Sequence, residues 1–264
     1  MRVALVVVAL ALAVCSPGRA ADAEGRWPNG AKAAIVLTYD DALTSQLDNA
    51  VPVLDEAGFK GTFFLSGVKQ ADVSRWRQAA MNGHELGNHT IFHACAAASY
   101  PTEPRNTAEA YTIPSILKEI EQQNVLLTAL DGKDRHGLAT PCGQSLAGGA
   151  DYIEALRAAN LVDYVRAAGA SGDEVRDGLP GGDVMHVPAR GFPDDVTGKE
   201  LIAYAEQARR GGGMAVFLFH GVGGDYLQTS NAAHRELVAW LAEHRSEVWV
   251  TTLGEAARHA AAHR

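Results

Sequence analysis

Short apolar runs alternate with longer amphipathic stretches along most of the chain. Eight apolar runs predict strands, and the segments between them carry apolar residues at helical spacing. The predicted strands lie at 33–39, 61–66, 85–88, 137–140, 162–168, 185–189, 214–220 and 248–252. The predicted helices lie at 44–57, 71–81, from 113 onward with much of 118–123 facing water, and at 150–159, 199–210 and 232–244.

A strand followed by a helix, repeated along the chain, is typical of a parallel sheet covered by helices. About seven such units without an obvious linker predict a single α/β domain, a closed or nearly closed (β/α)7-type parallel barrel. Chemistry in such a barrel lies at the carboxyl ends of the strands. Polar residues do follow the predicted strands there: Asp40 and Asp41, the segment 88–93, the segment 141–143, and His220.

The first residues have the pattern of a secretory signal peptide. Arg2 precedes an apolar run at 3–14, and small residues follow. We expect a signal peptide at 1–23 and one domain at 24–264, exported to the periplasm or the extracellular space. The residue before Cys15 is larger than a lipoprotein motif prefers, which favours plain cleavage over lipid anchoring.

Composition and charge exclude several classes of partner. The chain has 264 residues and a formal net charge of -8, with no stripe of Lys and Arg, which argues against nucleic-acid binding. After the signal peptide no apolar run approaches the length of a membrane span. The oligomeric state stays open.

The polar residues at the strand ends suggest a metal site with acid and base groups. His89 and His93 are four residues apart, and with one carboxylate from Asp40 or Asp41 they could hold a metal ion with open positions. The other aspartate could then accept a proton from a metal-activated water. His220 ends an apolar strand before a glycine loop and could protonate a leaving group.

Four motifs in this order resemble those of the polysaccharide deacetylase family, carbohydrate esterase family 4, which carries the NodB homology domain. They are TYDD at 38–41, HTIFH at 89–93, TPCG at 140–143 and FLFHG at 217–221, and the match extends from 33 to about 255. The resemblance implies a distorted parallel barrel and a divalent metal, usually zinc, with Co²⁺ or Ni²⁺ as alternatives.

The resemblance also implies a role for each motif residue. Asp40 matches the catalytic base, and His220 matches the general acid. Asp41, His89 and His93 match the metal ligands, and Thr90, also in the second motif, is expected to shape the loop.

The third motif departs from the family pattern. Its implied contribution is a backbone amide, here that of Cys142, which helps to stabilise the oxyanion of the tetrahedral intermediate. Many relatives carry an arginine where Ala139 stands and an aromatic residue at the position of Cys142. We expect the arginine tether from Arg166 or Arg190, with Arg166 preferred, because an arginine at an apolar strand end needs a partner. The carboxylate that orients His220 is open among three candidates: Asp183, Asp194 and Asp195.

Cysteines and aromatic residues complete the candidate site. Cys95 and Cys142 adjoin motifs that are expected to converge, so in an oxidising compartment they could form a disulfide. The alternative is two buried free thiols. Tyr226 in the glycine loop is the best candidate to stack on a sugar ring.

These features predict a secreted, metal-dependent deacetylase that removes N-acetyl or O-acetyl groups from a glycan, such as a chitin-type chain, peptidoglycan or acetylxylan. The main alternative is a glycan-binding protein on a catalytically impaired deacetylase scaffold, motivated by the missing arginine. A non-haem iron oxygenase is weakly supported, since the one histidine followed two residues later by a carboxylate, His234 with Glu236, lies on a predicted helix where such positions diverge. A glycosidase would need two separated carboxylates rather than an adjacent pair.

Overall fold

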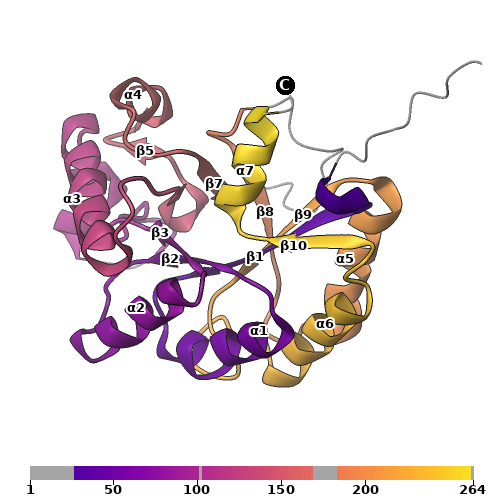
Figure 1. Ribbon diagram of the computed structural model, residues 1–264. Helices are drawn as coiled ribbons and strands as arrows, with labels where there is room; N and C mark the ends of the chain where they lie inside the picture. Colours follow the sequence, from indigo (N-terminus) through magenta and orange to yellow (C-terminus); the bar gives the residue numbers. More distant parts are fainter. Residues whose placement is uncertain (1–26, 101–102, 169–182, 263–264) are drawn as a thin grey trace, which may run out of the picture.

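A closed ring of parallel strands forms the centre of the molecule (Figure 1). The computed structural model describes residues 27–100, 103–168 and 183–262, so the predicted signal peptide lies outside the described residues. The sheet runs β10-β1-β2-β3-β4-β7-β8-β9, and it closes because β1 also pairs with β9. Seven of these strands form the ring, and β10 pairs with the first half of β1 beside it. The predicted single-domain (β/α)7-type barrel is confirmed.

Each strand of this sheet overlaps a run predicted from the sequence. Their bounds are β1 (Ala33–Asp40), β2 (Thr62–Leu65), β3 (Glu85–Asn88), β4 (Leu138–Ala139), β7 (Val165–Ala168), β8 (Val187–Gly191), β9 (Met214–Phe219) and β10 (Val248–Thr251). A small antiparallel pair, β5 (Leu146–Ala147) and β6 (Ala150–Asp151), was not predicted. Leu146, Ala150 and Asp151 are exposed, so this pair leaves no buried apolar run of the kind that marks a strand.

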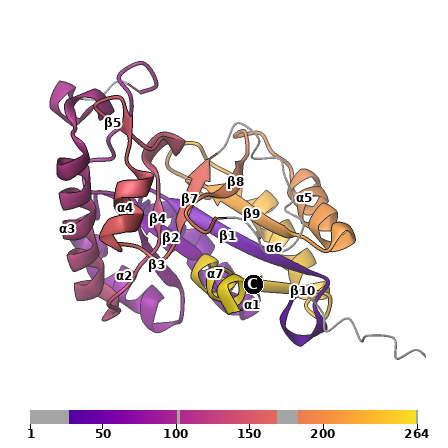
Figure 2. The ribbon, with the colours of Figure 1, turned by 90° about the horizontal axis from the view of Figure 1, so that it is seen from above.

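Helices surround the strands, from α2 and α3 on one side through α1 to α6 and α5 on the other (Figures 1 and 2). Their bounds are α1 (Val51–Ala57), α2 (Val73–Met81), α3 (Ile113–Asp131), α4 (Ile153–Ala159), α5 (Gly198–Gly211), α6 (Asn231–Glu243) and α7 (Leu253–Ala262). The helix predicted at 44–57 is a π-helical turn at Gln46–Ala50 followed by α1. Pro52 lacks the N–H that an uninterrupted α-helix needs there. Helix α7 was not predicted.

Alternation along each strand separates the inside of the barrel from the outside. On β1, Ile35 and Leu37 join the core beneath the helices, whereas Ala34 and Val36 join the core inside the ring. Phe64 of β2 fills that interior, and a Cβ on the neighbouring Gly87 would lie 2.4 Å from its ring. Only glycine fits at this place without a shift of Phe64.

The two ends of the barrel interior differ in polarity. At the end where the strands begin, Trp27 and two residues of α7, Leu253 and Ala256, join the interior apolar cluster. Toward the carboxyl ends, buried polar side chains join the interior, and Asp40 and Arg166 are among them. The chemistry-bearing residues are therefore collected at the carboxyl edge of the strands, as expected for a parallel barrel.

Candidate metal centre and active site

Three side chains at the carboxyl edge form a triangle of the size that one metal ion needs. Oδ1 of Asp41 lies 3.4 Å from Nε2 of His89 and 3.5 Å from Nε2 of His93, and the two Nε2 atoms are 3.1 Å apart. A tetrahedral ion bound at about 2.1 Å separates its ligands by about 3.4 Å. Two imidazoles and one carboxylate suit zinc or a similar transition metal better than Mg²⁺ or Ca²⁺. The residues present fit such an ion and leave a coordination position open.

The histidine rings are oriented for this role. Nδ1 of His89 donates a hydrogen bond to the carbonyl of Ala139 at 2.8 Å, which leaves Nε2, on the side of Asp41, available to bind a metal ion. Burial opposes a charge on His89, but Asp40 and Asp41 raise its pKa above the ordinary value. Burial, aided by the neighbouring His89, lowers the pKa of His93 to about 4, so that ring is neutral near pH 7.

Asp41 is strongly biased toward the carboxylate form. Burial alone would raise its pKa, but the hydrogen bond to His89 and the charges of His89, His93 and His220 hold the pKa well below the usual range. A metal ligand must be deprotonated, so this environment suits cation binding.

Unfavourable backbone conformations gather at this site. Of nine non-glycine residues with positive φ in the described ranges, five are Asp41 (76°), Ala42 (52°), Thr90 (60°), His93 (51°) and Cys142 (52°). Each such conformation costs on the order of 1 kcal/mol or more, and it persists only where the surroundings enforce it. Two of the five are the candidate ligands Asp41 and His93.

Hydrogen bonds enforce the shape of the loop between the two histidines. The hydroxyl of Thr90 accepts from the amide of His93 at 3.0 Å. One carboxylate oxygen of Glu119, on α3, accepts from the amides of Ile91 and Phe92, each at 2.9 Å. Residues 118, 121 and 122 face water, in line with the prediction that much of 118–123 does, but Glu119 is only 8% exposed. Its place one turn after the buried Ile116 was the available signal.

The structure brings Asp40 together with Arg166 and not with Arg190. Nη2 of Arg166 donates to Oδ2 of Asp40, both side chains are buried, and the guanidinium lies 5.2 Å from the centre of the Phe64 ring. Arg190 extends to the outside, 5.1 Å from the rings of Phe192 and Tyr204. The strand position, inward for Arg166 and outward for Arg190, decides which arginine reaches the site.

His220 faces the candidate ligands from the end of β9. Its Nε2 lies 3.9 Å from Oδ2 of Asp41, and the hydroxyl of Tyr226 donates to the same oxygen at 3.0 Å. Gln46, which sequence reasoning missed, donates from Nε2 to the backbone carbonyls of Asp40 (2.5 Å) and His220 (3.0 Å). This side chain fixes the ends of two neighbouring strands relative to each other.

None of the three carboxylates expected to orient His220 contacts it in the described part of the chain. Asp183 forms an ion pair with Arg157, and Asp194 and Asp195 are exposed. The carboxylate nearest to His220 there is the candidate ligand Asp41.

Cys95 and Cys142 are joined by a disulfide, with their Cα atoms 5.7 Å apart. Sγ of Cys95 lies 3.4 Å from Nδ1 of His93. Cys142 stands in the turn Pro141–Gly143 that follows β4. The disulfide therefore connects the loop after β3 to the turn after β4, beside a candidate metal ligand.

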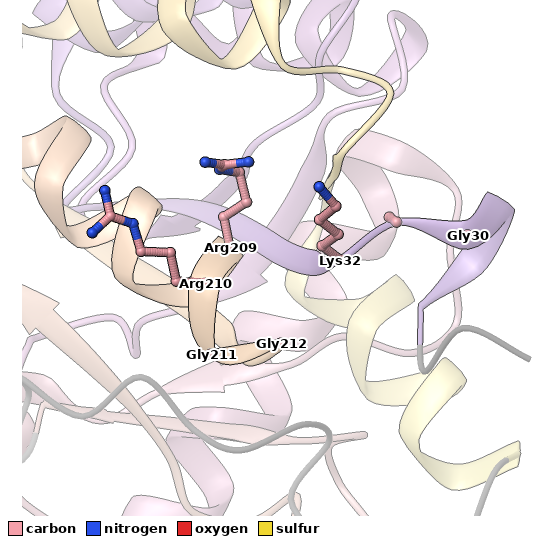
Figure 3. Close-up of a pocket in the computed structure, with 7 residues that line it drawn as sticks. Gly30, Lys32, Arg209, Arg210, Gly211 and Gly212 are labelled. Carbon is pink, nitrogen blue, oxygen red and sulfur yellow. The ribbon is translucent and has the colours of Figure 1, made fainter. Parts of the chain in front are cut away.

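A cavity of about 560 Å³ lies at the other edge, where β1 and β9 begin (Figure 3). It is lined by Lys32, Arg209 and Arg210, whose cations are all paired. Lys32 and Arg209 each contact Glu247 at 2.5 Å, and Arg210 contacts Glu206 at 2.8 Å. Cations also stabilise the carboxyl end of a helix, here α5. These residues support the structure and lie away from the candidate site.

Solved structures of other proteins are similar to this fold. The structure of a Mycobacterium smegmatis protein assigned to the polysaccharide deacetylases superposes on this one with a TM-score of 0.62. The two sequences are 19% identical, and the match covers 89% of this chain and 92% of that one. The peptidoglycan deacetylase PdaC from Bacillus subtilis gives a TM-score of 0.53, at 17% identity over 87% and 92% of the two chains. At these identities the similarity concerns the fold.

A curated relative matches part of the sequence. A gellan lyase from a Bacillus species is 27% identical over 128 residues, which are 48% of this chain but only 5% of that protein. This chain thus spans a small part of the curated relative's length. No helix among the described residues is long and apolar enough to cross a membrane.

The family model of the polysaccharide deacetylases matches residues 28–161, just over half of the chain. That segment holds Asp40, Asp41, His89 and His93, and the similar solved structures share the seven-stranded barrel. The chain belongs to the polysaccharide deacetylase family, carbohydrate esterase family 4 with its NodB homology domain, whose activity is that of hydrolases acting on acetylated carbohydrates.

Proposed function

We propose that this chain is an exported, metal-dependent deacetylase that hydrolyses acetyl groups on a glycan. The observation that carries the proposal is the triangle of Asp41, His89 and His93, with Asp40 on one side and His220 on the other. Zinc fits this ligand set best, and Co²⁺ or Ni²⁺ suit the same atoms. When bound, such an ion supplies a water nucleophile at neutral pH and polarises the carbonyl group under attack.

Asp40 acts as the proton acceptor. Arg166 holds its Oδ2, whereas its buried Oδ1 has no hydrogen-bond partner among the described residues. A buried carboxylate oxygen without a partner is costly unless a ligand or water completes it. Oδ2 lies 3.6 Å from Nε2 of His89, so the carboxylate of Asp40 is close enough to the candidate ligands to take the proton as the nucleophile attacks.

His220 and the turn after β4 serve the second half of the reaction. The ring of His220 gives a proton to the departing nitrogen of an amide or oxygen of an ester. The amide of Cys142, which has no partner among the described residues, donates to the oxyanion. Tyr226 is 53% exposed and offers its ring to a sugar while its hydroxyl holds Asp41.

The catalytic domain extends over 24–264, after a signal peptide at 1–23 that directs export to the periplasm or the extracellular space. The substrate is an acetylated glycan, and chitin-type chains, peptidoglycan and acetylxylan are the classes to compare. The alternative of an impaired scaffold was motivated by the missing third-motif arginine. Arg166 donates a hydrogen bond to Asp40, so the missing third-motif arginine no longer supports this alternative.

Acetate release tests the proposal. The mature protein is incubated with chitooligosaccharides, peptidoglycan and acetylated xylan, before and after chelation and after reloading with zinc. We expect release from at least one substrate, lost with the chelator and restored by zinc. Release that persists in metal-free protein would overturn metal dependence. Glycan binding without release from any zinc-loaded sample would favour the impaired scaffold instead.

A further inference from the structure

The two candidate histidine ligands, His89 and His93, differ in the group that contacts the ring nitrogen on the side away from the metal site. A metal-binding histidine usually donates its second ring N–H to a carboxylate, a backbone carbonyl or water, and this contact fixes the ring. His89 follows the rule through the carbonyl of Ala139 at 2.8 Å. On His93, Nδ1 faces Sγ of Cys95 at 3.4 Å, and sulfur is a weak acceptor. The contact that orients His93 is therefore made by the disulfide.

The same disulfide also reaches the turn after β4, through Cys142. Its second half, Cys142, has a left-handed backbone (φ 52°) in the turn Pro141–Gly143, and its amide is the proposed oxyanion donor. Left-handed conformations of residues other than glycine need support from their surroundings. A covalent bond to Cys95, two residues from His93, provides such support.

We propose that the Cys95–Cys142 disulfide is a positioning element of the metal centre, which fixes the ring of His93 and the turn that carries the Cys142 amide. The inference rests on the proposed function and adds a dependence on redox state. With the disulfide broken, His93 loses its neighbour at Nδ1 and the turn loses its crosslink. The oxidised chain binds zinc more tightly than the reduced chain.

Reduction is achieved with a water-soluble phosphine, because dithiols themselves bind zinc. The phosphine attacks one sulfur and the S–S bond breaks. Water then supplies the oxygen of the phosphine oxide and the two protons of the thiols. The two electrons lost by phosphorus are those gained by the sulfur pair. A Cys95→Ser, Cys142→Ser variant removes the crosslink without leaving thiols that could bind zinc themselves.

Zinc affinity, measured by competition with a chromophoric chelator, is compared among the oxidised protein, the reduced protein and the double-serine variant. We expect the reduced protein and the double-serine variant to bind zinc about 10- to 100-fold more weakly than the oxidised protein. Loss of a group that orients a metal ligand typically has an effect of this size. Circular dichroism checks that each sample is folded. If the double-serine variant does not fold, a Cys95→Ala, Cys142→Ala variant carries the comparison, because the reduced natural protein has two thiols beside His93 that could bind zinc. Affinities within twofold of the oxidised protein would overturn the proposal.

A kinetic measurement separates this proposal from the proposed function. With zinc saturating, the double-serine variant should show a lower kcat with KM unchanged, because the Cys142 amide acts on the oxyanion and not on the bound substrate. If the natural protein binds zinc with the predicted redox dependence but releases no acetate, the deacetylase assignment fails and the positioning role stands. If acetate release depends on zinc but the zinc affinity is the same with and without the disulfide, the positioning role of the disulfide is refuted and the proposed function stands.

Discussion

Replacing Arg166 by methionine tests the buried pair at the base of the site. Arg166 is 1% exposed and Asp40 is 3% exposed, so Arg166→Met leaves a carboxylate buried without its partner. Breaking a buried pair in this way costs about 3–5 kcal/mol of the free energy of unfolding. The lost contact with the Phe64 ring adds about 1 kcal/mol. We therefore expect a loss of about 4–6 kcal/mol for the single variant.

A double-mutant cycle shows whether the loss comes from the pair itself. Asp40→Asn leaves the Arg166 cation buried alone and should cost a similar amount, whereas the combined variant buries neither charge. Urea unfolding of the four proteins gives the free energies, and equal slopes confirm comparable unfolded states. Losses below 1 kcal/mol for both single variants, or strict additivity in the combined one, would refute the reasoning.

Arg190→Met is the matched control, because it removes an arginine of a neighbouring strand that also stacks on aromatic rings. Arg190 lies outside the barrel against Phe192 and Tyr204. Its replacement should cost about 1 kcal/mol and leave kcat near that of the natural protein, while Arg166→Met lowers kcat. An equal loss of kcat in both would contradict the assignment of Arg166.

Other contacts of the site and core make further predictions. Glu119→Ala should weaken zinc binding about 10-fold or more in a chelator competition, whereas Glu119→Gln keeps an acceptor for the loop amides and should rescue most of it. Tyr226→Phe, which loses the bond to Asp41, should lower zinc affinity severalfold in the same assay. Burial lowers the pKa of His84 and His234 to about 4, below the unfolded value near 6.5. The unfolded chain thus binds more protons, and urea unfolding should show stability falling by up to roughly 3 kcal/mol per histidine from pH 6.5 to 4; a flat profile would contradict this.

The regular part of the barrel was predictable because strands buried on both faces leave a strong apolar signal. The same alternation distinguishes the two candidate arginines: Arg166 shares its parity with the inward Tyr164, and Arg190 has the opposite parity to the inward Ala189. We preferred Arg166 because a buried arginine without a partner is costly. This reason applies equally to Arg190, so it does not by itself distinguish the two residues. Parity within each strand is the stronger criterion.

Other features depend on tertiary contacts that no local pattern carries. Helix α7 is rich in alanine, which marks no face of a helix clearly, and its apolar face is defined by the barrel end that Leu253 and Ala256 close. Gln46 and Glu119 are polar residues that the fold turns inward to bond backbone groups of distant segments. Such roles follow from where unsatisfied backbone atoms lie, which is known only after the loops are built.

The most direct test of the account is zinc content and acetate release measured on the same samples of the natural protein, Asp40→Asn and Asp41→Asn. In the proposed mechanism Asp41 binds the metal and Asp40 takes the proton, although the two residues are adjacent in sequence. We expect Asp40→Asn to retain one zinc per chain without releasing acetate, and Asp41→Asn to lose both zinc and activity. Full acetate release by Asp40→Asn, or normal zinc content in Asp41→Asn, would contradict this mechanism.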